Sequence, residues 1–140
     1  MKRISEAVWN GDLKTGNGEV KLGSGAYAGQ YSFSSRFESG VGTNPEELIG
    51  AAHAGCYSMA LSASLEKKGY IPVQVATIAS VKLEKKDIGF TITTIQLEVE
   101  AFCKKIDEET FLKIAEEAKE NCPVSRALTG VKIELSARLL

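Results

Sequence analysis

The sequence predicts an α+β fold with mostly antiparallel strands, built as a single domain that covers residues 1–140. Alternating, β-branched segments surround two helical segments in the order βββ-α-ββ-α-β, and both helical segments carry start and stop signals. No internal repeat, low-complexity tract or linker interrupts the chain, and 140 residues are enough to bury a core. These observations favour one compact domain over an array or a pair of domains.

Six segments are predicted to be strands. The N-terminal part contributes "ISEAVWNG", "GEVKLGSG" and "AYAGQYSFSSRF", which are separated by turn residues. The middle of the chain contributes "VQVATIASVKLEK" and "FTITTIQLEVEAF", which are joined around residues 87–89 and are therefore expected to form a hairpin. The segment "VKIELSARLL" is predicted to be the last strand.

The first predicted helix lies in "TNPEELIGAAHAGCYSMALSASLEKKG", residues 43–69. Asn44 is a suitable N-cap, Pro45 suits the first helical position, and Glu47 lies where a capping box needs it. Gly69 follows the last turn, which is where a helix often ends in the left-handed conformation. The signals at both ends therefore predict one long helix.

The second predicted helix runs from about Glu108 to Asn121, with Asp107 as its N-cap. It is expected to end near Cys122, because Pro123 disfavours helical geometry in the residue before it, and "PVSRAL" could begin a short further helix. One apolar stripe is expected to face the core, and it consists of Phe111, Ile114, Ala115 and Ala118.

The middle of the first helix has no polar face, so it must be covered on more than one side. One sheet of a chain this short covers one side. We infer that a second copy of the chain covers the rest, which predicts an isologous homodimer. The alternative is a monomer whose own sheet and second helix wrap around this helix.

Composition excludes several classes of protein. A net charge of −1 and a pI of about 5.9 give no electrostatic footprint for nucleic acid or an anionic membrane. The N-terminal segment "MKRISEAVWNGD" lacks the apolar region of a signal peptide. The uncharged run at residues 48–65 is rich in small residues and too weakly hydrophobic to span a membrane comfortably. We therefore expect a cytoplasmic protein.

The three cysteines need separate explanations, because an odd number is unlike a secreted disulfide framework. Cys56 lies in the apolar middle of the long helix, where most thiols are inert packing groups. Cys122 lies between two predicted helices, and N–H groups of the second would favour its thiolate, although a small capping residue is the simpler interpretation. Cys103 ends a strand and is expected to be packed or idle. Spacing alone does not show that two of these thiols meet.

His53 is three residues before Cys56, so the two side chains occupy neighbouring positions on one helix. A Cys–His nucleophile pair is conceivable. A hydrogen-bonded structural histidine is the more common case, and the cysteines and the one histidine lack zinc-ligand spacing.

Two stretches, "RFESGVGTNPEELIGAAHAGCYSMAL" and "NCPVSRAL", closely resemble the OsmC branch of the OsmC/Ohr family of thiol peroxidases, and the predicted strand order agrees with that family over the whole chain. The resemblance implies an OsmC/Ohr-like fold, an intertwined homodimer whose two long central helices pack back to back. It also implies a two-cysteine site built from both subunits.

Carried over by position, Cys56 matches the peroxidatic cysteine of the family and Cys122 matches the resolving cysteine. Arg36 of "SRFE" matches the arginine that holds the thiolate, and Glu46 matches the glutamate that pairs with that arginine. The helix-end argument alone favours Cys122 as the low-pKa thiol, whereas the resemblance assigns the attack to Cys56. A buried thiol needs a cation to ionise, and Arg36 is the expected cation.

The resemblance implies reduction of organic hydroperoxides, and less efficiently of hydrogen peroxide, in oxidative and osmotic stress defence. The cycle would pass through a sulfenic acid and an intrachain disulfide, need no bound cofactor or metal, and use an external dithiol, for which a lipoyl-type dithiol is the family's candidate. The apolar residues Phe37, Leu48, Tyr57 and Met59 could line the substrate entrance or belong to the core. Two alternatives remain, namely a non-catalytic thiol redox sensor or binding module on the same fold, and a structural dimer with packed cysteines.

Overall fold

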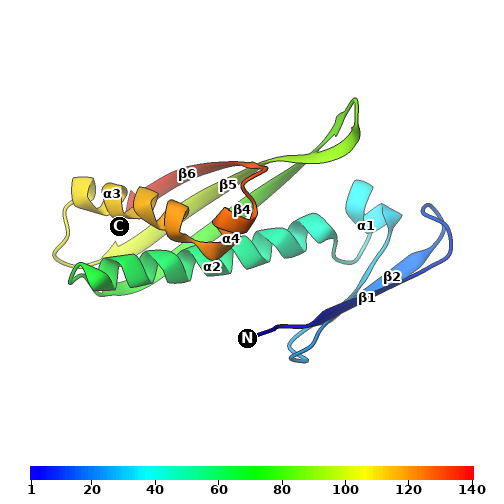
Figure 1. Cartoon of the computed structure of the whole chain (residues 1–140), viewed down its shortest axis with the longest axis horizontal. Coiled ribbons are helices and arrows are strands. Elements are labelled where there is room, and N and C mark those ends of the chain that lie inside the picture. The colour runs from blue at the N-terminus through cyan, green and yellow to red at the C-terminus, as the bar shows by residue number, and fades with distance from the viewer. The chain divides into compact units, whose positions relative to one another are not determined.

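The computed structural model describes all residues 1–140 and comprises two compact units, Met1–Leu48 and Ile49–Leu140. The predicted α+β class is confirmed, and the strands follow one another in the predicted order, while the single-domain assignment stays a prediction. The elements, labelled in Figure 1, are β1 (Ser5–Asn10), β2 (Asn17–Leu22), β3 (Ala28–Tyr31), α1 (Phe33–Phe37), α2 (Pro45–Lys67), β4 (Pro72–Lys86), β5 (Gly89–Cys103), α3 (Glu108–Asn121), α4 (Pro123–Ala127) and β6 (Lys132–Leu139).

The first unit contains an antiparallel sheet in the order β1-β2-β3. The third predicted strand is too long, because the chain leaves the sheet after Tyr31 and forms the short helix α1. A capping box causes this change: the Ser32 hydroxyl accepts from the Ser35 N–H at 3.1 Å, and the Ser35 hydroxyl accepts from the Ser32 N–H at 2.8 Å. Arg36 consequently lies on a helix rather than at the end of a strand.

The second unit contains a mixed sheet in the order β4-β5-β6. β4 and β5 form the predicted antiparallel hairpin, and Gly89 at its turn has a φ of +117°, a conformation that favours glycine. β6 pairs with β5 in parallel, so the chain crosses over through α3 and α4 between these two strands.

The core of the second unit lies on one face of this sheet. Alternate residues of β5 from Ile95 to Cys103 are buried on that face, while Gln96, Glu98 and Glu100 between them are exposed. Helices α2 and α3 pack on the apolar face, and the predicted stripe of α3 is buried. The fully buried core side chains include Tyr57, Leu61, Leu65, Ile95, Leu97, Ala101, Phe111, Ala115 and Ala118.

The predicted caps define the ends of both main helices. The Asn44 side-chain oxygen accepts from the Glu47 N–H at 2.8 Å, and Gly69 beyond the last turn of α2 has a φ of +89°. The Asp107 carboxylate accepts from the Thr110 N–H at 2.9 Å at the start of α3. Local sequence signals therefore set these boundaries.

One face of α2 is left uncovered by the other elements of the second unit. It consists of small residues around Met59, whose exposed fraction is 76%, and we call it the α2 stripe: Ala51, Ala52, Gly55, Met59 and Ala63. The most apolar 18-residue window of α2 has a mean hydropathy of 1.2, with 28% of it buried, which suffices by length and composition to cross a membrane. Such a value is weak support for a membrane span, because the core helix of a soluble protein can reach it too, and here small residues rather than leucine supply much of it.

Candidate active site

The structure brings together two thiols that are far apart in sequence. Cys56 lies in the middle of α2, and Cys122 lies at the junction where α3 ends and α4 begins. The Cys56 thiol is within hydrogen-bonding reach of the Cys122 sulfur. Both cysteines are free thiols in the structure.

The pKa values of the two thiols are shifted in opposite directions. Burial raises the pKa of Cys56, and its Cys122 neighbour raises it further, although the Val124 N–H works in the other direction. Burial also opposes ionisation of Cys122, but the Ser125 N–H, the Cys56 thiol and the Ser125 hydroxyl outweigh it and lower the Cys122 pKa. Within the second unit the pair therefore favours a negative charge on Cys122, as the helix-end argument predicted.

Access to the two sulfurs also differs. Cys122 has an exposed fraction of 0%, whereas Cys56 is half-buried. Cys56 lines a mainly apolar groove of about 440 Å³ that follows α2 and is completed by Asn121 and Pro123. A small molecule that enters this groove reaches Cys56 first. The other groove residues are Met59, Ala60, Ala63, Ser64 and Lys67.

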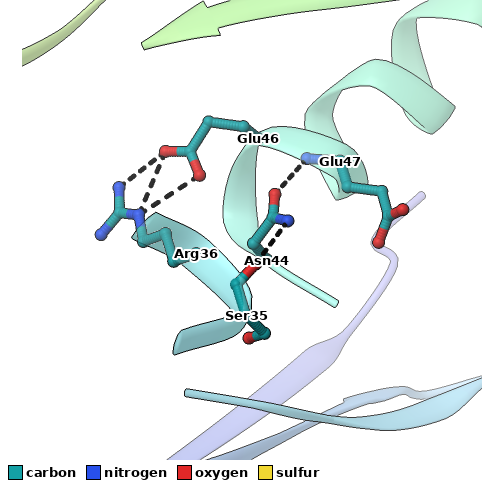
Figure 2. A network of polar contacts seen from close by, with 5 residues as sticks. All are labelled: Ser35, Arg36, Asn44, Glu46 and Glu47. Carbon is teal, nitrogen blue, oxygen red and sulfur yellow. Dashed lines mark hydrogen bonds and ion pairs between the residues drawn. The ribbon is translucent and has the colours of Figure 1, made fainter. Parts of the chain in front are cut away.

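Arg36 and Glu46 form a bidentate ion pair in the first unit. The Arg36 Nη2 lies 2.7 Å from the Glu46 Oε1, and Nε lies 3.2 Å from both carboxylate oxygens. Figure 2 shows this pairing beside Asn44, whose amide donates to the Ser35 carbonyl while its oxygen caps α2. The pair uses one edge of the guanidinium and leaves the Nη1 donors free to bind another acceptor.

An apolar pocket of about 200 Å³ adjoins Arg36 in the first unit. The guanidinium also lies over the Phe37 ring, 5.2 Å from its centroid, which fixes its orientation further. An anion-binding side chain next to an apolar pocket suits a ligand with a polar head and an apolar body. The pocket is lined by Trp9, Leu13, Tyr31, Ser32, Phe33, Arg36, Phe37 and Pro45.

Other candidate residues have structural positions. Cys103 is buried at the end of β5, and burial raises its pKa. Tyr57 belongs to the core, where its hydroxyl donates to the Ala115 carbonyl at 2.8 Å, so it does not line an entrance. His53 is fully buried and touches Ser125 instead of forming a Cys–His pair. No cluster of three His, Cys, Asp or Glu side chains is placed to hold a metal ion.

Sequence reasoning missed Ser125 and the groove beside Cys56. Ser125 is the third residue after Cys122 in "CPVSRAL", the position whose N–H and side chain face an N-cap residue at the start of a helix. That spacing was available in the sequence and could have identified it. The groove depends on how α2 and the start of α4 pack, which no local pattern reveals.

Comparison with known proteins agrees with the resemblance seen in the sequence motifs. The sequence model of the family described as OsmC-like protein matches residues 38–136. The chain is 51% identical over 129 residues to peroxiredoxin OsmC of Escherichia coli (strain K12), an alignment that covers 91% of this chain and 90% of the relative. It is 34% identical over 102 residues to the organic hydroperoxide resistance protein OhrB of Bacillus subtilis (strain 168), covering 70% of this chain and 73% of the relative.

Solved structures share the fold. An OsmC-like protein from Mycoplasma pneumoniae superposes with a TM-score of 0.79 at 15% identity, covering 100% of this chain and 98% of that chain. An organic hydroperoxide resistance protein from Legionella pneumophila superposes with a TM-score of 0.75 at 23% identity, covering 98% of this chain and 96% of that chain. The expected OsmC/Ohr-like chain fold is therefore confirmed.

Proposed function

The chain belongs to the OsmC-like protein family, and from this premise we propose that it is a thiol peroxidase that reduces organic hydroperoxides in oxidative stress defence. The observation that carries the proposal is the contact between the thiols of Cys56 and Cys122, because a two-cysteine cycle requires two sulfurs that can bond. The names of the relatives, a peroxiredoxin and organic hydroperoxide resistance proteins, support the same reaction class.

In the proposed cycle, the Cys56 thiolate attacks the distal oxygen of the hydroperoxide, the O–O bond breaks, and the alkoxide leaves as an alcohol after it takes up a proton. Cys56 becomes a sulfenic acid, and Cys122 displaces its hydroxyl as water to form the intrachain disulfide. An external dithiol, for which a lipoyl-type dithiol is our candidate, restores both thiols by exchange. The half-buried position of Cys56 on the groove supports its assignment as the attacking sulfur.

We assign to Arg36 the role of cation and donor for this chemistry, with Glu46 holding it. A thiol whose pKa is raised by burial needs a nearby positive charge to ionise. The bidentate geometry of the Arg36–Glu46 pair fits this role, since it fixes the planar guanidinium and leaves donors available for the departing alkoxide.

A turnover assay tests the proposed function. With a small dithiol in excess, the protein is expected to consume cumene hydroperoxide catalytically and to prefer it over hydrogen peroxide when both compete. The apolar lining of the groove beside Cys56 is the physical reason for this preference. A protein that forms the disulfide once but turns over negligibly would instead be a redox sensor.

We further propose that the working form is a cytoplasmic homodimer in which the α2 stripes of two copies pack together. The exposed apolar surface around Met59 supports this, because such surface is stabilised by burial against a partner. Met59 and Ala63 also border the groove beside Cys56, so the partner would form one of its walls.

Gly55→Leu is expected to dissociate this dimer. Within the second unit a Cβ added at Gly55 would meet no atom within 4 Å beyond the adjoining backbone of α2, so there is room for a side chain in the monomer, and the substitution also removes a helix-weakening glycine. At a close helix–helix contact the added isobutyl group would prevent packing. Light scattering should report a dimer for the wild type and a monomer for Gly55→Leu, whereas Lys113→Leu, at an exposed position of α3, should stay dimeric. A variant at position 55 that keeps the wild-type mass in solution contradicts the proposed interface.

A further inference from the structure

A buried histidine that the proposed cycle does not use lies next to the thiol pair. The exposed fraction of His53 is 0%, and its Nε2 lies 2.7 Å from the Ser125 Oγ. Its Nδ1 is also buried and has no hydrogen-bond partner. Ser125 in turn contacts the Cys122 sulfur through both its hydroxyl and its N–H. The imidazole on α2 is therefore linked, through one hydroxyl on α4, to the less accessible thiol.

The environment of His53 fixes its protonation. Burial lowers the pKa of His53, so the imidazole is neutral at neutral pH and carries one hydrogen. A buried N–H without a partner is rarer in proteins than a buried acceptor without one. We therefore assign the hydrogen to Nε2, and Nδ1 keeps its lone pair. In this tautomer His53 is the donor and the Ser125 Oγ is the acceptor.

This arrangement directs the Ser125 hydroxyl. Because its oxygen already accepts from His53, its hydrogen is free to donate to the Cys122 sulfur. That contact lowers the Cys122 pKa together with the Ser125 N–H, against the effect of burial. The other titratable group beside Cys122, besides Cys56 and His53, is Tyr57, and burial raises the pKa of Tyr57 so that its phenol stays protonated. The Cys122 sulfur is thus the position at which the site best holds a negative charge.

Accessibility gives the direction of the reductive step. Cys56 lines the groove, while Cys122 has no exposed surface. We propose that the reducing dithiol attacks the Cys56 sulfur of the disulfide, and that His53 is a positioning residue that aims the Ser125 hydroxyl at the departing Cys122 sulfur. The inference rests on the proposed function and specifies its reductive half.

The step balances as an ordinary thiol–disulfide exchange. A thiolate of the dithiol forms a bond with the Cys56 sulfur while the Cys56–Cys122 bond breaks, and its electron pair leaves on Cys122. The second thiol of the reductant then loses its proton and attacks the reductant sulfur that is bonded to Cys56. This step releases the Cys56 thiolate. Two electrons pass to the protein, and the reductant leaves as a disulfide. A leaving thiolate of lower pKa departs faster, which is the effect of the Ser125 hydroxyl.

Rapid-quench measurement of both half-reactions tests the role of the His53–Ser125 pair. The quantity compared is the ratio of two rate constants, that for reduction of the disulfide by dithiothreitol over that for reduction of cumene hydroperoxide. In Ser125→Ala this ratio should fall about three- to tenfold. His53→Leu should give the same loss, and His53→Gln, which keeps a donor near the Nε2 position, should recover most of it. The double variant Ser125→Ala/His53→Leu should lose no more than Ser125→Ala alone. If His53→Leu does not fold, Ser125→Ala and His53→Gln decide the matter.

Ser58→Ala is the matched control, because it removes a hydroxyl of α2 that lies 2.7 Å from the Thr77 hydroxyl and is not among the groups that perturb either thiol. The control should keep the wild-type ratio. An unchanged ratio in Ser125→Ala, or additive losses in the double variant, would overturn the assigned role of His53.

The direction of attack is tested separately by trapping. Protein whose disulfide has been formed with diamide is mixed briefly with limiting glutathione, quenched in acid, alkylated with iodoacetamide and mapped by peptide mass spectrometry. Glutathione is expected on Cys56 and the alkyl group on Cys122, and the opposite pattern would overturn the inference. Failure of the proposed function looks different, since the protein would then not consume cumene hydroperoxide catalytically, whichever sulfur glutathione attacks.

Discussion

Arg36→Lys is expected to slow hydroperoxide reduction by about 100-fold or more while the Cys56 pKa changes little. Lysine keeps the positive charge but loses the planar fork that pairs with Glu46 through Nε and Nη2. The arginine is therefore expected to act less as a source of charge than as a fixed set of donors for the O–O bond and the departing alkoxide.

Magnitudes favour this interpretation. A thiol with a pKa of about 8.5 is roughly 3% ionised at pH 7, so complete ionisation gains at most about 30-fold. Lowering the pKa by about 2.5 units also lowers nucleophilicity, and a Brønsted slope of about 0.4–0.5 makes that loss roughly tenfold. Ionisation therefore gains only a few-fold. Orientation of the peroxide and stabilisation of the leaving oxygen must supply the larger part of the acceleration.

Stopped-flow mixing of reduced protein with cumene hydroperoxide measures the effect of Arg36→Lys, and the pH dependence of thiolate absorbance in a Cys122→Ser background gives the Cys56 pKa. Arg138→Lys is the matched control, because Arg138 forms an exposed ion pair with Glu100 on the sheet and has no proposed role. The control should react at the wild-type rate. An Arg36→Lys variant that also keeps the wild-type rate would contradict the orientation argument.

Cys122→Ser is expected to abolish sustained turnover while a first equivalent of hydroperoxide is still reduced. Without a second sulfur the Cys56 sulfenic acid cannot form the disulfide, so further peroxide oxidises it irreversibly to the sulfinic acid. Steady-state consumption of cumene hydroperoxide with a dithiol in excess should fall by about 100-fold or more, which reflects loss of the enzyme rather than a slower attack.

Cys103→Ser is the control for this second prediction, since Cys103 is buried at the end of β5 and has no assigned role. It should turn over like the wild type. Intact-mass measurement should find two added oxygens on Cys122→Ser after excess peroxide and none on the wild type. Normal sustained turnover by Cys122→Ser would exclude Cys122 as the resolving thiol.

The long elements were predictable because their signals are local. Asp107 caps α3, Asn44 caps α2, and alternation marks β4 and β5, each within a few residues of chain. The short helix α1 was missed although the Ser32–Ser35 capping box is also local, because the β-like residues before it suggested a longer strand. The parallel pairing of β6 with β5 was not predictable, since it depends on the crossover through α3 and α4.

The site was predictable only in part. The family motifs identified Cys56, Cys122, Arg36 and Glu46, and the structure contains both the thiol contact and the Arg36–Glu46 ion pair. Their catalytic roles remain predictions. The helix-end position of Cys122 predicted that it has the lower pKa of the two thiols, and the structure agrees. Spacing could not reveal that the two sulfurs meet, because their contact depends on how α2 packs against the junction of α3 and α4.

Peptide mass spectrometry after one equivalent of cumene hydroperoxide tests the central claim most directly. The predicted product is oxidised protein in which a disulfide joins Cys56 to Cys122 and Cys103 is still a thiol. Recovery of three free thiols, or of oxygen added to Cys56 with Cys122 unaltered, would contradict the account.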